Sequence, residues 1–186
     1  IPKPKEYEQK YKKFICLNAA AKPHRAKLVC HLIDNEGHEG YISSIRFLNE
    51  SNVLTASGDS TSSYWDIEKG KQIQNFTGHS ADVLCLALDP TSPSLFVTSS
   101  CDSTAKIWDL RVGDRCMQNF VGHLSDVNSV SFFPYGNAVV TGSDDTTCRV
   151  FDLRCSGEVS NLGSDKVVCG VTSVDFSKSG RYIFGG

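Results

Sequence analysis

The chain has 186 residues, of which 40% are hydrophobic and 22% charged, and its formal net charge is −2. This composition is ordinary for a globular protein, and the length is sufficient for a domain with a sizeable core. General nucleic-acid binders usually carry a basic excess, so nucleic acid is not an expected partner. No run of residues approaches the roughly 18 apolar positions that a membrane-spanning helix needs.

Residues 1–33 form a basic segment whose sequence does not match the pattern of the remaining chain. Residues 1–35 contain eight Lys/Arg and three acids, about +5, so the remainder carries about −7. Residues 7–15, "YEQKYKKFI", place apolar side chains on one helical face and lysines opposite. Such a helix could contact a membrane or a partner, although a short segment that frays or is disordered is the expected outcome. Residues 25–33, "RAKLVCHLI", could be the outer strand of a preceding unit.

The eight cysteines do not predict a disulfide framework or a metal site. None forms a CxxC pair, and most lie inside apolar, strand-like runs, which favours reduced thiols that act as small core residues in the cytosol. No Cys/His cluster has the spacing of metal ligands, so neither a metal nor another cofactor is expected. Met117 is the only methionine, which predicts that the chain is a piece of a longer protein.

A period of about 43 residues organises the chain from Asp34 onwards. Between successive Gly-His and aromatic-Asp pairs lie segments of the form Ser-x-Asp-x-Thr-x-x-x-aromatic-Asp: "SGDSTSSYWD", "SCDSTAKIWD" and "SDDTTCRVFD". The paired positions are Gly37-His38, Gly78-His79 and Gly122-His123, and Trp65-Asp66, Trp108-Asp109 and Phe151-Asp152.

Each unit is predicted to contain four short strands. After Gly78-His79 come "DVLCLALDP", "LFVTSS", "TAKIWDL" and "RCMQNFVG", separated by Pro, Ser, Gly and Asp turn residues. Four strands closed by Gly-His and Trp-Asp resemble a WD-repeat β-propeller blade, an all-β fold. Residues 34–186 then hold three complete blades and a fourth that stops at Gly186. In the fourth unit Val167 stands where the histidine is expected.

The resemblance to WD repeats assigns the recurring polar residues to a buried hydrogen-bond chain. In that family the histidine links the turn aspartate, a strand Ser/Thr and the tryptophan N–H, and such a buried network must be fully satisfied to be tolerable. In the third unit Phe151 replaces Trp and cannot donate, so the chain is expected to stop at the serine or to recruit a water molecule. The predicted sets are His38, Ser57, Asp59 and Trp65; His79, Ser100, Asp102 and Trp108; and His123, Ser143 and Asp145.

The same residues invite comparison with a Ser-His-Asp hydrolase triad, but their repetition argues against catalysis. A catalytic site is expected once, whereas this constellation recurs about every 43 residues. Neither a Gly-x-Ser-x-Gly elbow nor a phosphate-binding glycine loop accompanies it. The chain is therefore predicted not to be an enzyme, with neither catalytic residues nor a small-molecule substrate.

Several phrases carry a narrower resemblance. "GHEGYISSIRFL", "LTASGDSTSSYWDIEKGKQ", "GHLSDVNSVSFFPYGNAVVTGSDDTTCRVFDLR" and "SVDFSKSGR" resemble heterotrimeric G-protein β subunits. The resemblance implies about four blades of a seven-bladed propeller in a signalling scaffold that binds GDP-bound Gα, a γ subunit and effectors. It also implies a cytoplasmic protein held at the inner face of the plasma membrane through its partners. The alternative is another WD-repeat adaptor, for example of a ubiquitin-ligase or RNA-processing complex.

The same resemblance implies a partner-binding rim built from blade-top loops. Asp82 and Asp126 have an alternative role in satisfying N–H groups of their turns. Of the adjacent acids, Asp145 is predicted to hold its blade together and Asp144 to face a partner. The predicted rim residues are Tyr41, Asp82, Leu84, Cys101, Asp126, Asn128 and Asp144.

Overall fold

The computed structural model of the chain describes residues 37–163 and 168–186. The expectations for residues 1–33 and for Val167 lie outside these ranges. Within them, no helix has the length and apolar character needed to cross a bilayer.

The described residues form three four-stranded antiparallel sheets and one strand pair, each in chain order. The first sheet contains β1 (Ile42–Phe47), β2 (Asn52–Ser57), β3 (Thr61–Asp66) and β4 (Lys71–Thr77). The second contains β5 (Val83–Leu88), β6 (Leu95–Ser100), β7 (Ala105–Asp109) and β8 (Cys116–Phe120). The third contains β9 (Val127–Phe132), β10 (Ala138–Ser143), β11 (Cys148–Asp152) and β12 (Gly157–Asn161). The last pair is β13 (Val174–Phe176) with β14 (Ile183–Gly185).

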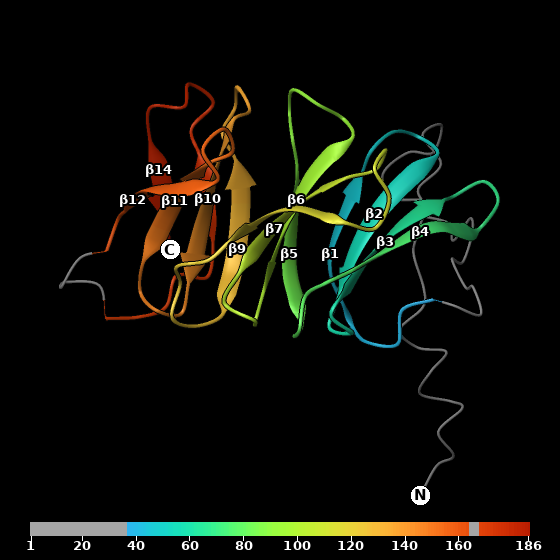
Figure 1. Cartoon of the computed structure of the whole chain (residues 1–186), viewed down its shortest axis with the longest axis horizontal. Helices are drawn as coiled ribbons and strands as arrows, with labels where there is room; N and C mark the ends of the chain where they lie inside the picture. The colour runs from blue at the N-terminus through green and yellow to red at the C-terminus, as the bar shows by residue number, and fades with distance from the viewer. Residues whose placement is uncertain (1–36, 164–167) are drawn as a thin grey trace, which may run out of the picture.

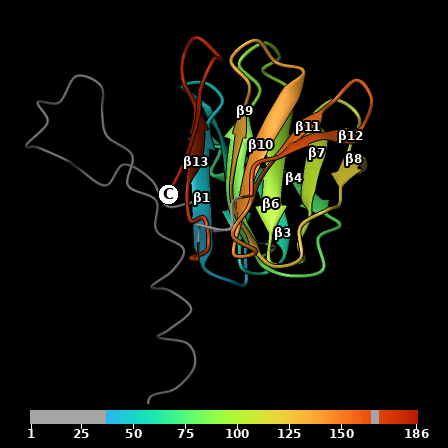
Figure 2. The same ribbon diagram turned by 90° about the vertical axis from the view of Figure 1, so that its left-hand side faces the viewer.

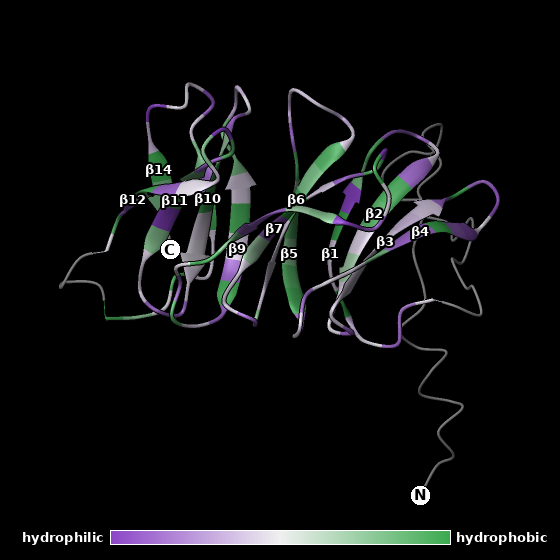
Figure 3. Ribbon diagram, viewed as in Figure 1, coloured by the Kyte–Doolittle hydropathy of each residue, from purple (hydrophilic) through white to green (hydrophobic). Residues whose placement is uncertain are grey.

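The position of each strand in its sheet follows from its hydrophobic pattern. The second strands β2, β6 and β10 are buried along almost their whole length, as strands covered on both faces should be. The outer strand β4 alternates exposed and half-buried residues, as a half-solvated strand should. Figure 3 shows the apolar colouring concentrated within strands such as β5 and the polar colouring in many of the connecting loops.

The sheets stand side by side as successive blades. Figure 1 shows them in chain order across the molecule, and Figure 2 looks along the row. Each first strand packs against the next: β1 contacts β5, β5 contacts β9, and β9 contacts β13. Hydrophobic clusters fill the seams between blades, for example Leu54, Phe76 and Trp108 with Leu86. The all-β WD-repeat propeller architecture predicted from the repeat is confirmed, as three complete blades and part of a fourth.

A β-bulge recurs at the start of the first strand of each complete blade. The pairing with the second strand shifts between Ile42 and Ser44, and between Val83 and Cys85. The third blade has the same shift, at the end of β10 opposite Val127. One residue per blade is thereby left out of the regular ladder. These residues are Ser43, Leu84 and Asn128.

The expectation that the cysteines are small core residues holds only in part. All six cysteines of the described ranges have free thiols, but Cys148 alone is buried, while Cys155 and Cys169 are exposed. Cys155 lies in the turn before β12 and Cys169 in the loop before β13. The residues next to Cys155 and Cys169 in the sequence did not show that these cysteines lie in a turn and a loop rather than inside a strand.

The turn after each second strand has a left-handed residue at the same place. Ser60, Ser103 and Thr146 directly follow the turn aspartates and have φ angles of 69°, 64° and 68°. In the third blade the Thr146 N–H donates to the Ser143 carbonyl at 3.2 Å, which closes a tight three-residue hairpin loop. A β-branched residue such as threonine is strained in this conformation.

We therefore expect Thr146→Gly to raise the free energy of unfolding by about 0.5–1 kcal/mol. The left-handed conformation costs a non-glycine residue roughly 1–2 kcal/mol, and the extra chain entropy of glycine offsets about half of that. Urea denaturation measures the change. Thr146→Ala keeps a Cβ and should gain much less, so equal stabilities of the two variants would contradict the strain.

Candidate functional site

A buried histidine–aspartate pair lies at the top of each complete blade. His38 Nδ1 lies 2.8 Å from Asp59 Oδ2, and His79 Nδ1 lies 2.7 Å from Asp102 Oδ2. The corresponding distance from His123 to Asp145 is 2.8 Å. The histidine arrives from the loop before the first strand and the aspartate from the turn after the second. Each pair therefore ties two separate loops of a blade together.

The hydroxyl that continues the chain belongs to a threonine, so the assignment of Ser57, Ser100 and Ser143 is wrong. His38 Nε2 lies 2.7 Å from Thr55 Oγ1, and Trp65 Nε1 donates to the same oxygen at 2.8 Å. The second blade repeats these distances at Thr98.

The serines instead stabilise the turn. Ser100 Oγ donates to the carbonyl of Ala81 at 3.0 Å and accepts from the Asp102 N–H at 3.1 Å. Ser143 makes the matching pair of bonds with Ser125 and Asp145. In the first blade Ser57 Oγ accepts from the Asp59 N–H at 3.2 Å.

One assignment of protons satisfies every group in the first two blades. The tryptophan N–H donates to the threonine oxygen, and the threonine O–H donates to the unprotonated Nε2 of a neutral histidine. The histidine Nδ1–H then donates to the aspartate. Thr55 and Thr98 are fully buried, so these bonds form where water cannot replace them.

The third blade lacks the tryptophan donor. His123 Nε2 lies 2.6 Å from Thr141 Oγ1. The hydrogen-bond network ends at this threonine and is one residue shorter than in the other blades. Phe151 packs against Phe120 of the second blade, with ring centroids 4.9 Å apart and planes at 23°. Trp108 makes a similar contact with Phe76 of the first blade, so the third blade keeps the aromatic contact across the seam and lacks only the hydrogen bond.

The turn aspartates are ionised and saturated with donors. Asp145 Oδ1 accepts from the Thr147 N–H and hydroxyl at 3.0 and 2.6 Å, while Oδ2 also accepts from the Leu124 N–H at 3.0 Å. Burial would raise the pKa of Asp145, but these bonds and that from His123 lower it well below its usual range. Burial lowers the pKa of His123, although the bond with Asp145 opposes this.

The aspartate of each aromatic-Asp pair has a separate role at the end of its strand. Asp109 accepts the Arg111 N–H at 2.9 Å and pairs with its guanidinium at 2.7 Å. Asp152 and Arg154 repeat this arrangement, and the Arg154 bonds lower the pKa of Asp152 to about 2. These acids hold the turn into the fourth strand and lie outside the histidine network.

The structure brings six of the seven predicted rim residues together. The Tyr41 hydroxyl of the first blade donates to Asp82 Oδ2 of the second at 3.0 Å, and the Cys101 N–H donates to the Asp82 carbonyl at 2.9 Å. In the third blade the Asp144 N–H donates to the Asp126 carbonyl at 3.0 Å. The Asn128 amide donates to the Asp144 carboxylate. Residues from three blades thus form one edge.

Cys101 lies among three carboxylates of this edge. Burial raises the pKa of the Cys101 thiol to about 11, helped by a hydrogen bond to Asp126 and by the charges of Asp126, Asp82 and Asp144. Burial and the bond to Asp82 likewise raise the pKa of Tyr41. The rim is therefore a partly exposed surface with a negative charge and a neutral thiol.

Leu84 differs from the other rim residues. It is half-buried at the bulge of β5, and its side chain cannot make the polar contacts that join the other six. Asn128 occupies the same place in the third blade and also donates to the Val171 carbonyl at 3.1 Å.

Two sets of functional residues were missed in the sequence. The strand threonines Thr55, Thr98 and Thr141 each stand two positions before the serine that was chosen, in "TASGD", "TSSCD" and "TGSDD". The turn threonines were part of the repeated motif but had no assigned role, and they bond the aspartate Oδ1 in all three blades. They are Thr61, Thr104 and Thr147.

The repeated sheets, the Gly-His and aromatic-Asp pairs and the shared rim define a WD-repeat β-propeller protein. The sequence model of the family described as G protein beta WD-40 repeat protein matches residues 17–186, and the chain belongs to this family.

Curated relatives agree with this family. The chain is 41% identical over 162 residues to a guanine nucleotide-binding protein subunit beta of Oryza sativa subsp. japonica, covering 81% of this chain and 43% of that protein. Over 160 residues it is 44% identical to the corresponding subunit of Solanum tuberosum, covering 81% and 42% of the two chains. Over 150 residues it is 48% identical to subunit beta-5b of Danio rerio, covering 80% and 38%. The chain therefore spans about two fifths of the length of these relatives.

We expect Thr98→Val to lower the free energy of unfolding by about 2–4 kcal/mol, because it leaves the buried Trp108 N–H and His79 Nε2 without their shared partner. Thr141→Val orphans only the histidine, so its cost should be about 1–3 kcal/mol. Chemical denaturation compares the two variants. Equal losses would contradict the difference between the tryptophan and phenylalanine blades.

The pKa directions predict that acid destabilises the blades in two steps. Below about pH 6.5 His123 takes up a proton in the unfolded chain, whereas its lowered pKa opposes protonation in the folded chain. The free energy of unfolding therefore decreases as the pH is lowered. Below about pH 4 the turn aspartates, whose pKa values are lowered in the folded state, add a further loss.

Thermal unfolding between pH 7.5 and 5.5 tests the first step. His123→Gln should unfold at a lower temperature at every pH, but its midpoint should depend less on pH than that of the unmodified chain. Parallel pH dependences would show that His123 does not resist protonation.

Proposed function

We propose that the chain is part of a non-enzymatic scaffold of heterotrimeric G-protein signalling, and that its rim binds GDP-bound Gα and, after release, effectors. The observation that carries the proposal is the convergence of rim residues from three blades, joined by Tyr41–Asp82 and Asp144–Asn128, in a chain of this family. A rigid sheet framework with specificity in its turns suits a protein that holds partners. Pairing with a γ subunit and attachment to the inner face of the plasma membrane through the partners belong to the same proposal.

The hydrogen-bond networks support a scaffold over an enzyme. The same His–Asp–Thr geometry occurs in three blades, with corresponding His–Asp and His–Thr distances agreeing within 0.1 Å. The threonine hydroxyls are fully buried and the aspartates already accept several hydrogen bonds, so these networks present neither a nucleophile nor a free base to solvent. These groups serve the fold rather than chemistry.

The charge of the rim suggests how a partner is recognised. The charges of Asp82, Asp126 and Asp144 all act on Cys101 and help to raise its pKa, so the rim favours a partner surface with basic side chains. Exposed charges of this kind act mainly on the rate of association and its dependence on salt.

Asp144→Ala is expected to weaken binding to GDP-loaded Gα by roughly 3- to 10-fold, mainly through slower association. Asp144 is exposed and its side chain bonds only at the surface, so the thermal midpoint should stay nearly unchanged. Binding kinetics of the complete protein with its γ subunit, measured against GDP-loaded and GTP-analogue-loaded Gα, provide the test.

Two matched variants control this experiment. Asp114→Ala removes an exposed acid from the loop between β7 and β8, at the opposite edge of the blade, and should leave binding unchanged. Asp145→Ala should lower thermal stability because it breaks the His123 pair. Binding that does not depend on the nucleotide would refute the Gα proposal, and equal instability of the Asp144 and Asp145 variants would refute the division between surface and fold.

A further inference from the structure

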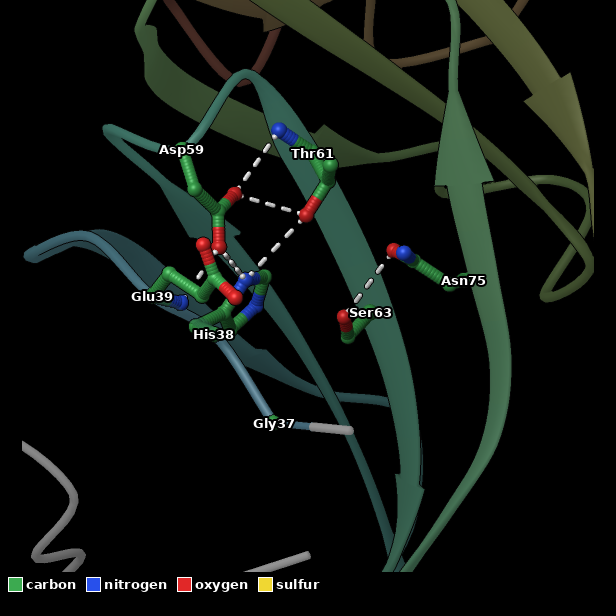
Figure 4. A pocket seen from close by; sticks show the side chains of 7 residues that line it. All are labelled: Gly37, His38, Glu39, Asp59, Thr61, Ser63 and Asn75. Atoms are coloured by element: carbon green, nitrogen blue, oxygen red, sulfur yellow. Dashed lines mark hydrogen bonds and ion pairs between the residues drawn. The ribbon is translucent and has the colours of Figure 1, made fainter. Parts of the chain in front are cut away.

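The first blade has a polar pocket beside its histidine–aspartate pair. Figure 4 shows His38, Asp59 and Thr61 joined by hydrogen bonds on one side of it, and Ser63 bonded to Asn75 on the other. The lining residues are Gly37, His38, Glu39, Asp59, Thr61, Ser63 and Asn75.

The other two blades carry a cation at the place of Ser63. Ser63 pairs with Asn75 between β3 and β4, and Lys106 pairs with Asn119 between β7 and β8 in the same register. In the third blade the matching residue is Arg149 on β11. The pocket therefore coincides with the position that a long basic side chain occupies in its neighbours.

The contacts of these cations show what the position can hold. Lys106 Nζ donates to Asn119 Oδ1 at 2.9 Å. Arg149 Nη2 lies 4.0 Å from Asp145 Oδ2, and Arg149 Nη1 lies 2.6 Å from Glu158 Oε2. A Cβ added to Gly122 would lie 3.0 Å from Arg149 Nη1, which places the guanidinium over the Gly-His loop. Its counterpart in the first blade is Gly37, a lining residue of the pocket.

The first blade has no cation at this position and an additional acid beside it. It has neutral Ser63 in place of the cation, and Glu39 where the second and third blades have Ser80 and Leu124 after the histidine. The Asp59 side chain is 15% exposed, compared with 8% and 6% for its counterparts. Two carboxylates and an amide oxygen thus face a space into which no cation from residues 37–163 or 168–186 extends.

We propose that this pocket binds a cationic side chain of a partner polypeptide, which takes the place that Lys106 and Arg149 fill in the other blades. Arginine fits best, because its planar fork can pair with the Glu39 carboxylate and the Asn75 amide oxygen while lying over Asp59. Among the three blades that the structure describes in full, the first alone has this site, and the site does not depend on the acidic rim or on Gα.

The two tryptophans provide a reporter and an internal control for the test. Trp65 Nε1 is connected to the pocket through Thr55 and His38, whereas Trp108 is in the blade whose position is filled by Lys106. Titration of the isotopically labelled complete protein with N-acetylarginine methylamide should shift the Trp65 indole resonance, with half-saturation in the millimolar range, and leave the Trp108 resonance unchanged. The neutral citrulline analogue should shift neither.

Two variants decide the outcome. Ser63→Arg should abolish the Trp65 shift and raise the thermal midpoint, because the chain then supplies its own cation. Glu39→Gln, at an exposed position, should keep the fold and weaken binding of the arginine analogue by at least threefold. Any of three results would overturn the proposal. The first is an equal shift of both tryptophan resonances, and the second is an undiminished Trp65 shift in Ser63→Arg. The third is the absence of a shift at 50 mM ligand, which is about fifty times the expected half-saturation.

Discussion

The threonine hydroxyl at the centre of each blade is the interaction on which the rest of the structure depends. In the first two blades a single buried oxygen accepts from a tryptophan of the third strand and donates to a histidine that enters from the preceding loop. The histidine fixes the turn aspartate, and the aspartate fixes the backbone of both loops. Because a half-satisfied buried network is costly, the third blade, which lacks the tryptophan, still keeps the bonds from His123 to Thr141 and to Asp145. The network therefore fixes the conformation of the loops that carry the histidines and the turn aspartates.

The repeat predicted most of the fold, because the chemistry of the turns and the strand pattern both have the same period. It could not choose between threonine and serine. Thr98 and Ser100 both recur in every blade, and residues two apart on a strand point to the same face, so their identities and spacing fit the network equally well. The choice depends on how deeply the histidine ring reaches into the blade, which only the packed structure determines. Leu84 lies at a bulge that interrupts the alternation of the strand, so the face toward which this position points could not be read from that alternation.

Repetition also explains why the side chains of two surfaces can differ from blade to blade. Asp144 and Cys101 occupy a turn position that the hydrogen-bond network does not use, so the rim can vary without loss of the fold. Ser63, Lys106 and Arg149 share a register position on the third strand, and their side chains are not links of the Trp–Thr–His chain. The fold therefore tolerates a neutral residue in one blade and cations in the next two. Local charge can differ from blade to blade while the framework stays the same.

The bulges at the start of the first strands give the seams between blades different characters. In the first seam the bulged Ser43 donates to the Val83 carbonyl of the next blade, and in the third seam Asn128 donates to the Val171 carbonyl. The middle seam has Leu84 at this position, and a leucine cannot donate, so cohesion there relies more on apolar contact. Apolar contact weakens on cooling, whereas directional hydrogen bonds do not share this dependence. That seam also holds the largest hydrophobic cluster of the described residues and a bond from the Gln118 amide to the Leu153 carbonyl at 2.6 Å, so the seams are held by different mixtures of apolar contact and hydrogen bonding.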